Sequence, residues 1–150
     1  MTRHRRRVAI AAAVVAFLAV SLVVGRWLQA DNAERAKVER LLNAQARGDA
    51  TAMANEIEPC KAACRQQLER LATRLRADAD DTAEVEIVRY DSKTARALGA
   101  ETAPTRVVWQ RKGLLPTVQC VGVRRSGDAL TGPDVTLVGL SAPIERQASC

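Results

Sequence analysis

The chain has 150 residues and a net charge of +6 at pH 7, but this charge is unevenly distributed. Residues 1–30 contain five arginines and no acidic residue, whereas residues 31–150 contain 18 basic and 17 acidic side chains. Because the larger part has almost no excess positive charge to neutralise phosphates, its composition does not indicate nucleic-acid binding. Its length suits one domain and is too short for two.

The N-terminal segment predicts a membrane anchor. Residues 8–25 are 18 consecutive residues without a charge, and a helix of this length covers about 27 Å, near the hydrocarbon thickness of a bilayer. The basic cluster at residues 3–7 should stay in the cytoplasm under the positive-inside rule. We therefore expect a cytoplasmic flank at residues 1–7, a single-pass signal-anchor helix in the lipid bilayer at residues 8–27, and an extracytoplasmic domain at residues 31–150.

A cleaved signal peptide is the main alternative to a permanent anchor. Ala30 could precede a cleavage site, but Leu28 occupies a position where signal peptides place a small residue. The apolar stretch is also longer than the usual 7–15 residues. These two features favour an uncleaved anchor.

The outer domain should begin with helices. Val38, Leu41 and Leu42 have the i, i+3, i+4 spacing of one helical face, which predicts a helix over residues 31–47 that Gly48 ends. This helix either starts at a cap at Asp31 or Asn32, or continues the anchor without a break.

Two further helices are expected before the sheet. A short one covers residues 50–57, and Pro59 should open another that runs to about residue 77, because proline suits the first turn of a helix. The polar sequence at residues 77–81 then marks a break.

The rest of the domain predicts strands. Four runs rich in β-branched residues occupy residues 85–90, 105–111, 117–124 and 135–140, and turn residues such as Lys112-Gly113 separate them. Short connections favour antiparallel neighbours, so we expect a four-stranded meander. Residues 91–103 form a longer connection. The arginines at the strand ends, Arg124 and Arg125 among them, should lie on a solvated rim.

Helices followed by an antiparallel meander resemble the nuclear transport factor 2-like (cystatin-like) superfamily, in its small membrane-tethered bacterial form. The resemblance covers about residues 33–145. It is carried by the stretches VERLLNAQARGDATAMANEI, VEIVRYDS, TRVVWQ, VQCVGVRRSG and VTLVGLSAPI. It implies an α+β fold, with two to three helices packed on a curved four-stranded sheet, and a cone-shaped cavity between them. This superfamily includes enzymes, ligand carriers and interaction domains, so the fold alone does not select a function.

Four cysteines follow the apolar segment, which indicates two disulfides in an oxidising compartment. Of the three possible connectivities we favour Cys60–Cys64 with Cys120–Cys150, and buried free thiols are the alternative. If Cys60 and Cys64 lay one turn apart on an ideal helix, their Cβ atoms would be too distant for a relaxed bond, so pairing implies a distorted first turn.

Tyr90 and Trp109 are the candidate residues for a cavity or ligand site. Tyr90-Asp91 pairs a phenol with a carboxylate, but adjacent strand residues point to opposite faces and should not converge. Trp109 on a strand is more often a core residue than a ligand platform. The one histidine, His4, lies outside the outer domain, which removes the usual general base near neutral pH. An enzyme would need an inward Asp or Glu beside Tyr90 or Trp109.

No motif indicates a cofactor or metal. Phosphate-binding and dinucleotide-binding glycine loops are missing from the sequence. The C-x₃-C spacing does not match a redox or zinc motif, and the aspartates of residues 78–81 lack the glycine of a calcium loop. We therefore expect a non-catalytic interaction or assembly module of the bacterial cell envelope with an envelope protein as partner. The alternative is a small-ligand binding domain that uses the cavity, and an enzyme ranks third.

Overall fold

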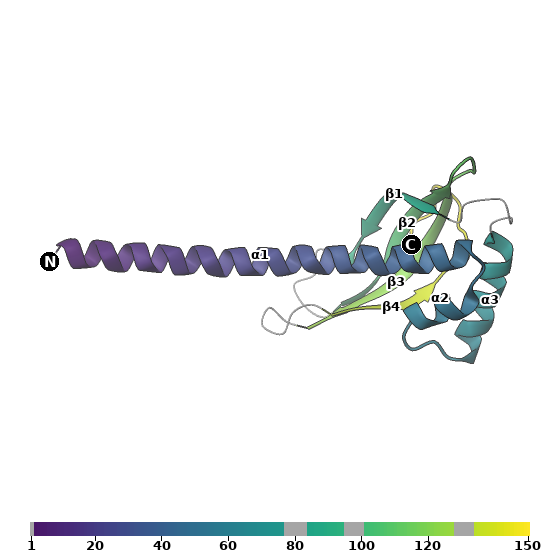
Figure 1. Ribbon diagram of the computed structural model, residues 1–150, viewed down its shortest axis with the longest axis horizontal. Coiled ribbons are helices and arrows are strands. Elements are labelled where there is room, and N and C mark those ends of the chain that lie inside the picture. The colour runs from purple at the N-terminus through teal and green to yellow at the C-terminus, as the bar shows by residue number, and fades with distance from the viewer. Residues whose placement is uncertain (1, 77–83, 95–100, 128–133) are drawn as a thin grey trace.

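A computed structural model of the chain describes residues 2–76, 84–94, 101–127 and 134–150; the side chains of residues 2–5 and of Trp27 are also outside the description. The described residues form one very long helix, two short helices and a four-stranded sheet (Figure 1). The expected α+β class with helices and an antiparallel sheet is therefore confirmed. The polar break and calcium candidates at residues 77–81 lie outside the described residues.

Helix α1 spans Thr2–Ala46 without interruption. Its apolar N-terminal part has a mean hydropathy of 2.8 over the most apolar 18 residues, none of them buried, so its length and composition suffice to cross a membrane. The helix passes Asp31 and Asn32 unbroken, so a cap at those residues is wrong and the continuous alternative holds. Gly48 ends the helix in a left-handed conformation (φ +72°) that brings its N–H to the carbonyl of Gln45 at 3.0 Å.

Helix α2 spans Ala50–Glu56, and helix α3 spans Ala62–Leu75. Asp49 caps α2 by accepting a hydrogen bond from the Ala52 N–H at 2.9 Å. The prediction that Pro59 opens the third helix is wrong, because α3 starts three residues later. Before α3 begins, the segment that follows α2 pairs with β4: Ile57 bridges Leu137, and the Glu58 N–H donates to the Leu137 carbonyl at 2.8 Å. Pro59 follows a cis peptide bond in this connection.

The sheet is an antiparallel meander in the order β1-β2-β3-β4, as predicted. The strands are β1 (Val85–Ser92), β2 (Glu101–Arg111), β3 (Thr117–Ser126) and β4 (Asp134–Leu140). Both ends of the expected 91–103 connection belong to strands, and residues 95–100 lie outside the description. The Lys112-Gly113 turn is present, with the Leu114 N–H bonded to the Arg111 carbonyl at 3.0 Å.

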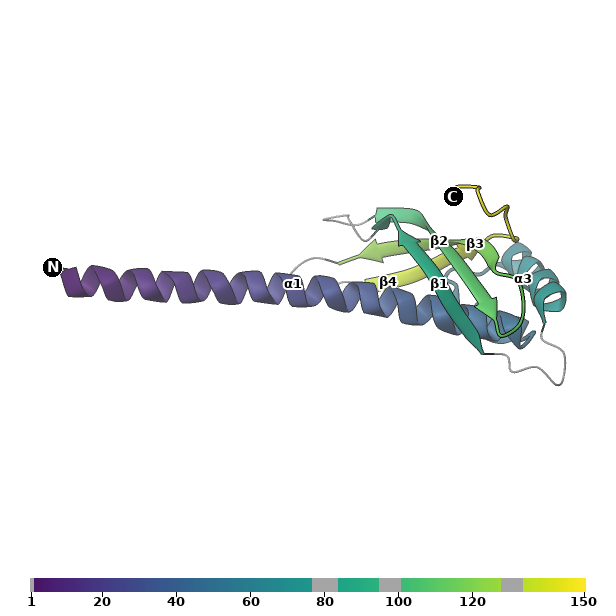
Figure 2. The same cartoon turned by 90° about the horizontal axis from the view of Figure 1, so that it is seen from above.

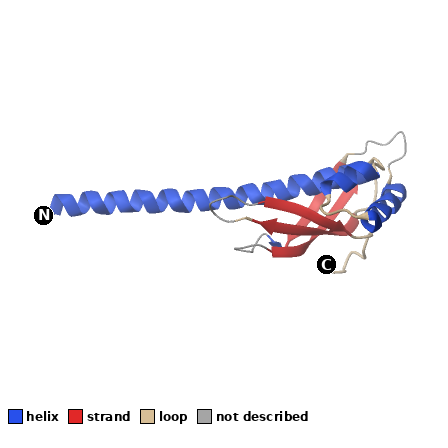
Figure 3. Ribbon diagram, turned by 90° about the horizontal axis from the view of Figure 1, so that it is seen from below, coloured by secondary structure: helices blue, strands red, loops and turns tan. Residues whose placement is uncertain are grey.

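The second half of α1 lies along one face of the sheet, and α2 and α3 cover the end of this face far from the N-terminus (Figures 2 and 3). The core forms between these layers because residues of one parity on β2 and β3 point toward the helices. Its largest buried apolar side chains come from all three helices and the sheet: Leu41, Leu42, Met53, Ile57, Leu68, Val107, Trp109 and Leu137.

Candidate functional site

A buried polar cluster joins α1 to the sheet where the apolar part of the helix meets the domain. Glu34 lies at its centre and has no exposed surface. The Glu34 Oε1 accepts hydrogen bonds from the Tyr90 hydroxyl at 2.6 Å and the Thr105 hydroxyl at 2.9 Å. The side chain of one helical residue therefore contacts both β1 and β2.

The second carboxylate oxygen of Glu34 also accepts two hydrogen bonds. Its Oε2 accepts from the Thr94 hydroxyl at 2.9 Å and from the Arg125 Nε at 2.8 Å. The Arg125 Nη2 lies 2.6 Å from the same oxygen and also donates to Asp31 Oδ1 at 2.9 Å. We call the six residues the Glu34 cluster: Asp31, Glu34, Tyr90, Thr94, Thr105 and Arg125.

The cluster fixes the charge states of its members. Burial alone would raise the pKa of Glu34, but hydrogen bonds from Tyr90 and Arg125 outweigh burial and hold this pKa below its ordinary value. Burial and the hydrogen bond to Glu34 raise the pKa of Tyr90 far above that of a free phenol. The pKa of Arg125 is also raised, because contacts with Glu34 and Asp31 outweigh burial. At neutral pH the cluster therefore contains an ionised carboxylate, a protonated phenol and a guanidinium.

The predicted site residues Tyr90 and Asp91 diverge, as the strand alternation requires. Tyr90 points inward to Glu34, whereas the Asp91 side chain is 46% exposed and pairs with Arg89 at 2.9 Å. The two groups do not form one acid–base pair. An inward carboxylate does lie beside Tyr90, but it belongs to Glu34, which sequence reasoning missed.

Two signals in the sequence point to this cluster. Glu34 lies four residues before Val38 and so extends the apolar face of the helix. Arg125 has the inward parity of Val121 and Val123 on β3. The prediction that Arg125 lies on a solvated rim is wrong: its side chain is 7% exposed and covers Glu34, while Arg124 faces solvent.

Trp109 is a core residue. It is 2% exposed, and its Nε1 donates to Gln119 Oε1 at 2.7 Å, while Gln119 Nε2 donates to the Ser141 carbonyl at 2.9 Å. Among the hollows on the surface of the described part of the chain are three of about 770, 750 and 220 Å³, and neither Trp109 nor Tyr90 lines any of these three. The structure thus places both cavity candidates in polar contacts within the packed interior.

The cysteines pair as expected, Cys60 with Cys64 and Cys120 with Cys150. Cys60 precedes α3 rather than lying within it, which allows a Cα–Cα distance of 5.3 Å despite the four-residue spacing. The distortion expected in the first turn therefore takes the form of a helix that begins after Cys60.

The second disulfide holds the C-terminal segment against the face of the sheet opposite α1 (Figure 2). Ile144 bridges Val118 on β3, and its N–H donates to the Val118 carbonyl at 2.8 Å. Arg106 donates to the carbonyls of Ala148 and Arg146. Backbone hydrogen bonds, the Arg106 side chain and a disulfide thus attach this segment to the sheet.

In comparisons with known proteins, no family model, curated protein or solved structure matches this chain.

Proposed function

We propose that this chain is a membrane-anchored, extracytoplasmic interaction or assembly module of the bacterial cell envelope, with a nuclear transport factor 2-like domain and no catalytic role. One observation carries the proposal. Helix α1 runs unbroken from an exposed apolar segment into the Glu34 cluster at the centre of the domain. The anchor and the principal core helix are therefore one element.

This continuous helix supports a role in which the domain presents a surface to a partner, because the domain follows its anchor without a flexible linker. Beyond the Glu34 cluster, Lys37 on α1 donates to the Val135 carbonyl of β4, and Asn43 accepts from the Val85 N–H of β1 at 3.1 Å. Both edge strands are thus bonded to the helix. Such a domain is held at a fixed orientation to α1, which suits a protein that positions a surface for a partner.

The disulfides support the exported location. They are typical of compartments outside the reducing cytosol. The basic residues that precede the apolar segment then mark the cytoplasmic side.

The hydrogen bonds already accepted by Glu34 support a domain without a catalytic role. A general base needs a lone pair that can reach a substrate proton, whereas Glu34 has no exposed surface and each of its oxygens accepts at least two hydrogen bonds. The neighbouring phenol already donates its proton to this carboxylate. The arrangement suits a structural ion pair better than acid–base chemistry.

A candidate contact surface lies at the turn between β2 and β3, on the end of the sheet far from the N-terminus (Figure 1). Leu114 is 48% exposed and Leu115 is 78% exposed. These two adjacent leucines present apolar side chains to solvent at the turn, and exposed apolar patches are a feature of interaction sites.

Photo-crosslinking in the native envelope tests the proposal. A photoreactive amino acid at Leu115 should give a discrete crosslinked product, whereas the same group at Arg74, an exposed residue of α3, should not. Equal, diffuse crosslinking from both positions would contradict an interaction role for this surface.

The alternative is a small-ligand binding domain, and one hollow favours it. About 750 Å³ opens between α1 and the start of β1, bordered by residues that include Arg35, Glu39, Glu84, Val85, Ile87 and Lys112. Mixed charge beside two apolar residues suits a zwitterionic or amide-bearing ligand. Ligand-dependent NMR shifts confined to these residues would support this alternative.

A further inference from the structure

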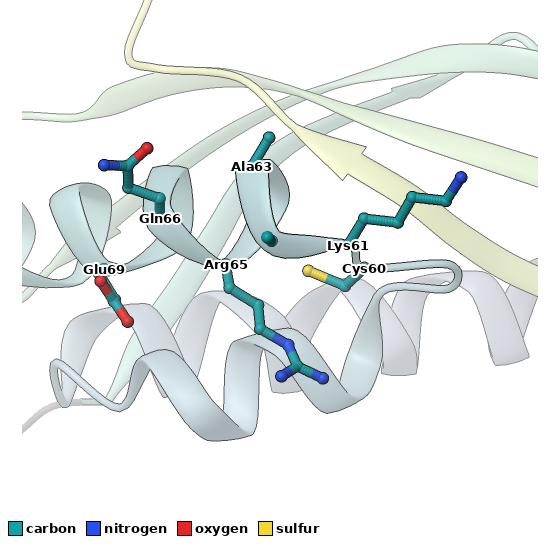
Figure 4. Close-up of a pocket in the computed structure, with 7 residues that line it drawn as sticks. Cys60, Lys61, Ala63, Arg65, Gln66 and Glu69 are labelled. Carbon is teal, nitrogen blue, oxygen red and sulfur yellow. The ribbon is translucent and has the colours of Figure 1, made fainter.

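We infer that the Cys60–Cys64 disulfide is a redox-active pair that exchanges with an external dithiol. The inference goes beyond the proposed interaction role and does not depend on it. Cys60 lines the surface hollow of about 770 Å³ at the start of α3, together with Lys61, Arg65, Gln66 and Glu69 (Figure 4). Both cysteines pack partly buried against the core, but Cys64 does not line the hollow. An incoming thiolate therefore has access to the sulfur of Cys60.

The start of α3 favours thiolate at both sulfurs. Lys61 is the N-cap residue, so Cys60 immediately precedes the helix and Cys64 lies in its first turn. No side chain caps the first N–H groups of this helix. Free N–H groups and the positive end of the helix dipole stabilise an anion there and lower a thiol pKa.

The positive charges around the hollow also favour the thiolate form of Cys60. Lys61 and Arg65 border Cys60, against one acid, Glu69. Neither Lys61 nor Arg65 forms a side-chain ion pair within the described part of the chain, so no carboxylate there neutralises either charge. A disulfide whose reduced form is stabilised as thiolate is reduced more easily.

Opening the Cys60–Cys64 disulfide should also cost less stability than opening Cys120–Cys150. Four positions separate Cys60 from Cys64, whereas 30 separate Cys120 from Cys150. A shorter closed loop restrains the unfolded chain less, so its disulfide contributes less to stability. Opening Cys60–Cys64 leaves α3 attached through its core residues Leu68 and Leu71.

The exchange has two steps and transfers two electrons. A thiolate of the external dithiol attacks Cys60 Sγ, which forms a mixed disulfide and breaks the Cys60–Cys64 bond, and Cys64 leaves as the thiolate. The second thiolate of the dithiol then attacks the other sulfur of the same dithiol, which is bonded to Cys60 in the mixed disulfide, and Cys60 leaves as a thiolate. The dithiol is oxidised to a disulfide and the cysteine pair is reduced.

Graded reduction of the full chain in detergent tests the inference. Samples equilibrated with different ratios of reduced to oxidised dithiothreitol are quenched with acid, alkylated and mapped by peptide mass spectrometry. Half-reduction of Cys60–Cys64 should require a ratio at least about ten-fold lower than that of Cys120–Cys150. Reduction of both bonds at one ratio, or of Cys120–Cys150 first, would overturn the inference.

Charge variants separate redox activity from simple exposure. The double variant Lys61→Ala/Arg65→Ala should need a several-fold higher ratio for half-reduction, because the thiolates lose their cations. Arg74→Ala, at the other end of α3, is the matched control and should not move the ratio. An unchanged ratio in the double variant would count against the charge argument.

The single thiol provides a second readout. In Cys64→Ser, the Cys60 thiol should react with a neutral aromatic disulfide at a rate that levels off well below pH 8.5, the ordinary pKa of a free cysteine. The intact Cys120–Cys150 bond and an unchanged circular dichroism spectrum verify the fold. A rate that still rises through pH 8.5 would show an unperturbed thiol and would overturn the inference.

Discussion

Arg125 on β3 donates from its Nε to Oε2 of Glu34 on α1 at 2.8 Å, although 91 positions separate the two residues. Both side chains are almost fully enclosed, with exposures of 7% and 0%. The contact places a charge of α1 in the interior between the helix and the sheet. Removing one member of such a pair leaves the other charge buried and unpaired, which is far more costly than the pair itself is stabilising.

Replacing Arg125 by methionine should therefore lower the free energy of unfolding by about 3–5 kcal/mol. Glu34 would keep its hydrogen bonds from Tyr90 and Thr105 but would lose its only cation within the described cluster. Urea unfolding followed by circular dichroism measures the change. Arg124→Met is the matched control: Arg124 faces solvent, so its replacement should change the free energy by less than about 0.5 kcal/mol.

Removing both charges together should cost less than removing Arg125 alone. The double variant Glu34→Gln/Arg125→Met no longer contains a buried unpaired carboxylate, so part of the loss should be recovered. If the two single losses simply add, Glu34 and Arg125 are not energetically coupled and the assigned role of the pair is wrong.

Glu34 should also make stability depend on pH in the acid range. Its pKa is lowered on folding from an ordinary value of 4.5, so its contribution is complete above this value and is lost as pH falls through the lower folded pKa. The difference in unfolding free energy between the natural chain and Glu34→Gln should therefore shrink as pH falls below about 4.5. A difference that is constant from pH 7 to pH 3 would contradict the pairing.

Tyr90 allows a direct spectroscopic check because it is the only tyrosine in the chain. Its raised pKa means that the folded protein should show no tyrosinate absorbance near pH 10, where the unfolded chain titrates. Absorbance should appear only together with alkaline unfolding, since the folded state loses stability as pH rises above the unfolded pKa. A folded protein that titrates near pH 10 would place Tyr90 in solvent.

The two disulfides should differ in their contribution to stability. The variant Cys120→Ser/Cys150→Ser opens a loop with a 30-residue separation and should lose about 3–4 kcal/mol of unfolding free energy. Cys60→Ser/Cys64→Ser opens a much shorter loop and should lose only about 2 kcal/mol. Thermal and urea unfolding measure both, and equal losses would contradict the ranking.

Much of the architecture followed from local patterns in the sequence. The four strands and their meander order could be predicted because alternating β-branched runs and short turns leave few other arrangements. Helix starts were harder. Pro59 has the local signature of a first helical turn, but pairing of Ile57 with Leu137 holds the chain extended and delays α3 to Ala62.

The Glu34 cluster could be predicted only in part. Tyr90 was a candidate from its place beside Asp91, but its actual partner lies 56 positions away on α1. Charged residues are ordinarily placed on the surface in sequence interpretation. Glu34 was therefore missed and Arg125 was assigned to a solvated rim, although each has the periodicity of a buried position. Only the packing of helix on sheet reveals that their charges compensate each other.

We propose that α1 anchors the chain in a membrane, with the disulfide-bonded domain outside the cytosol. An alkaline phosphatase reporter fused after Cys150 tests it most directly, because this enzyme becomes active only where its own disulfides form. The account predicts an active reporter in the membrane fraction. An inactive fusion, with a fluorescent reporter at the same position folding in the cytosol, would contradict the anchor, the disulfides and the envelope role together.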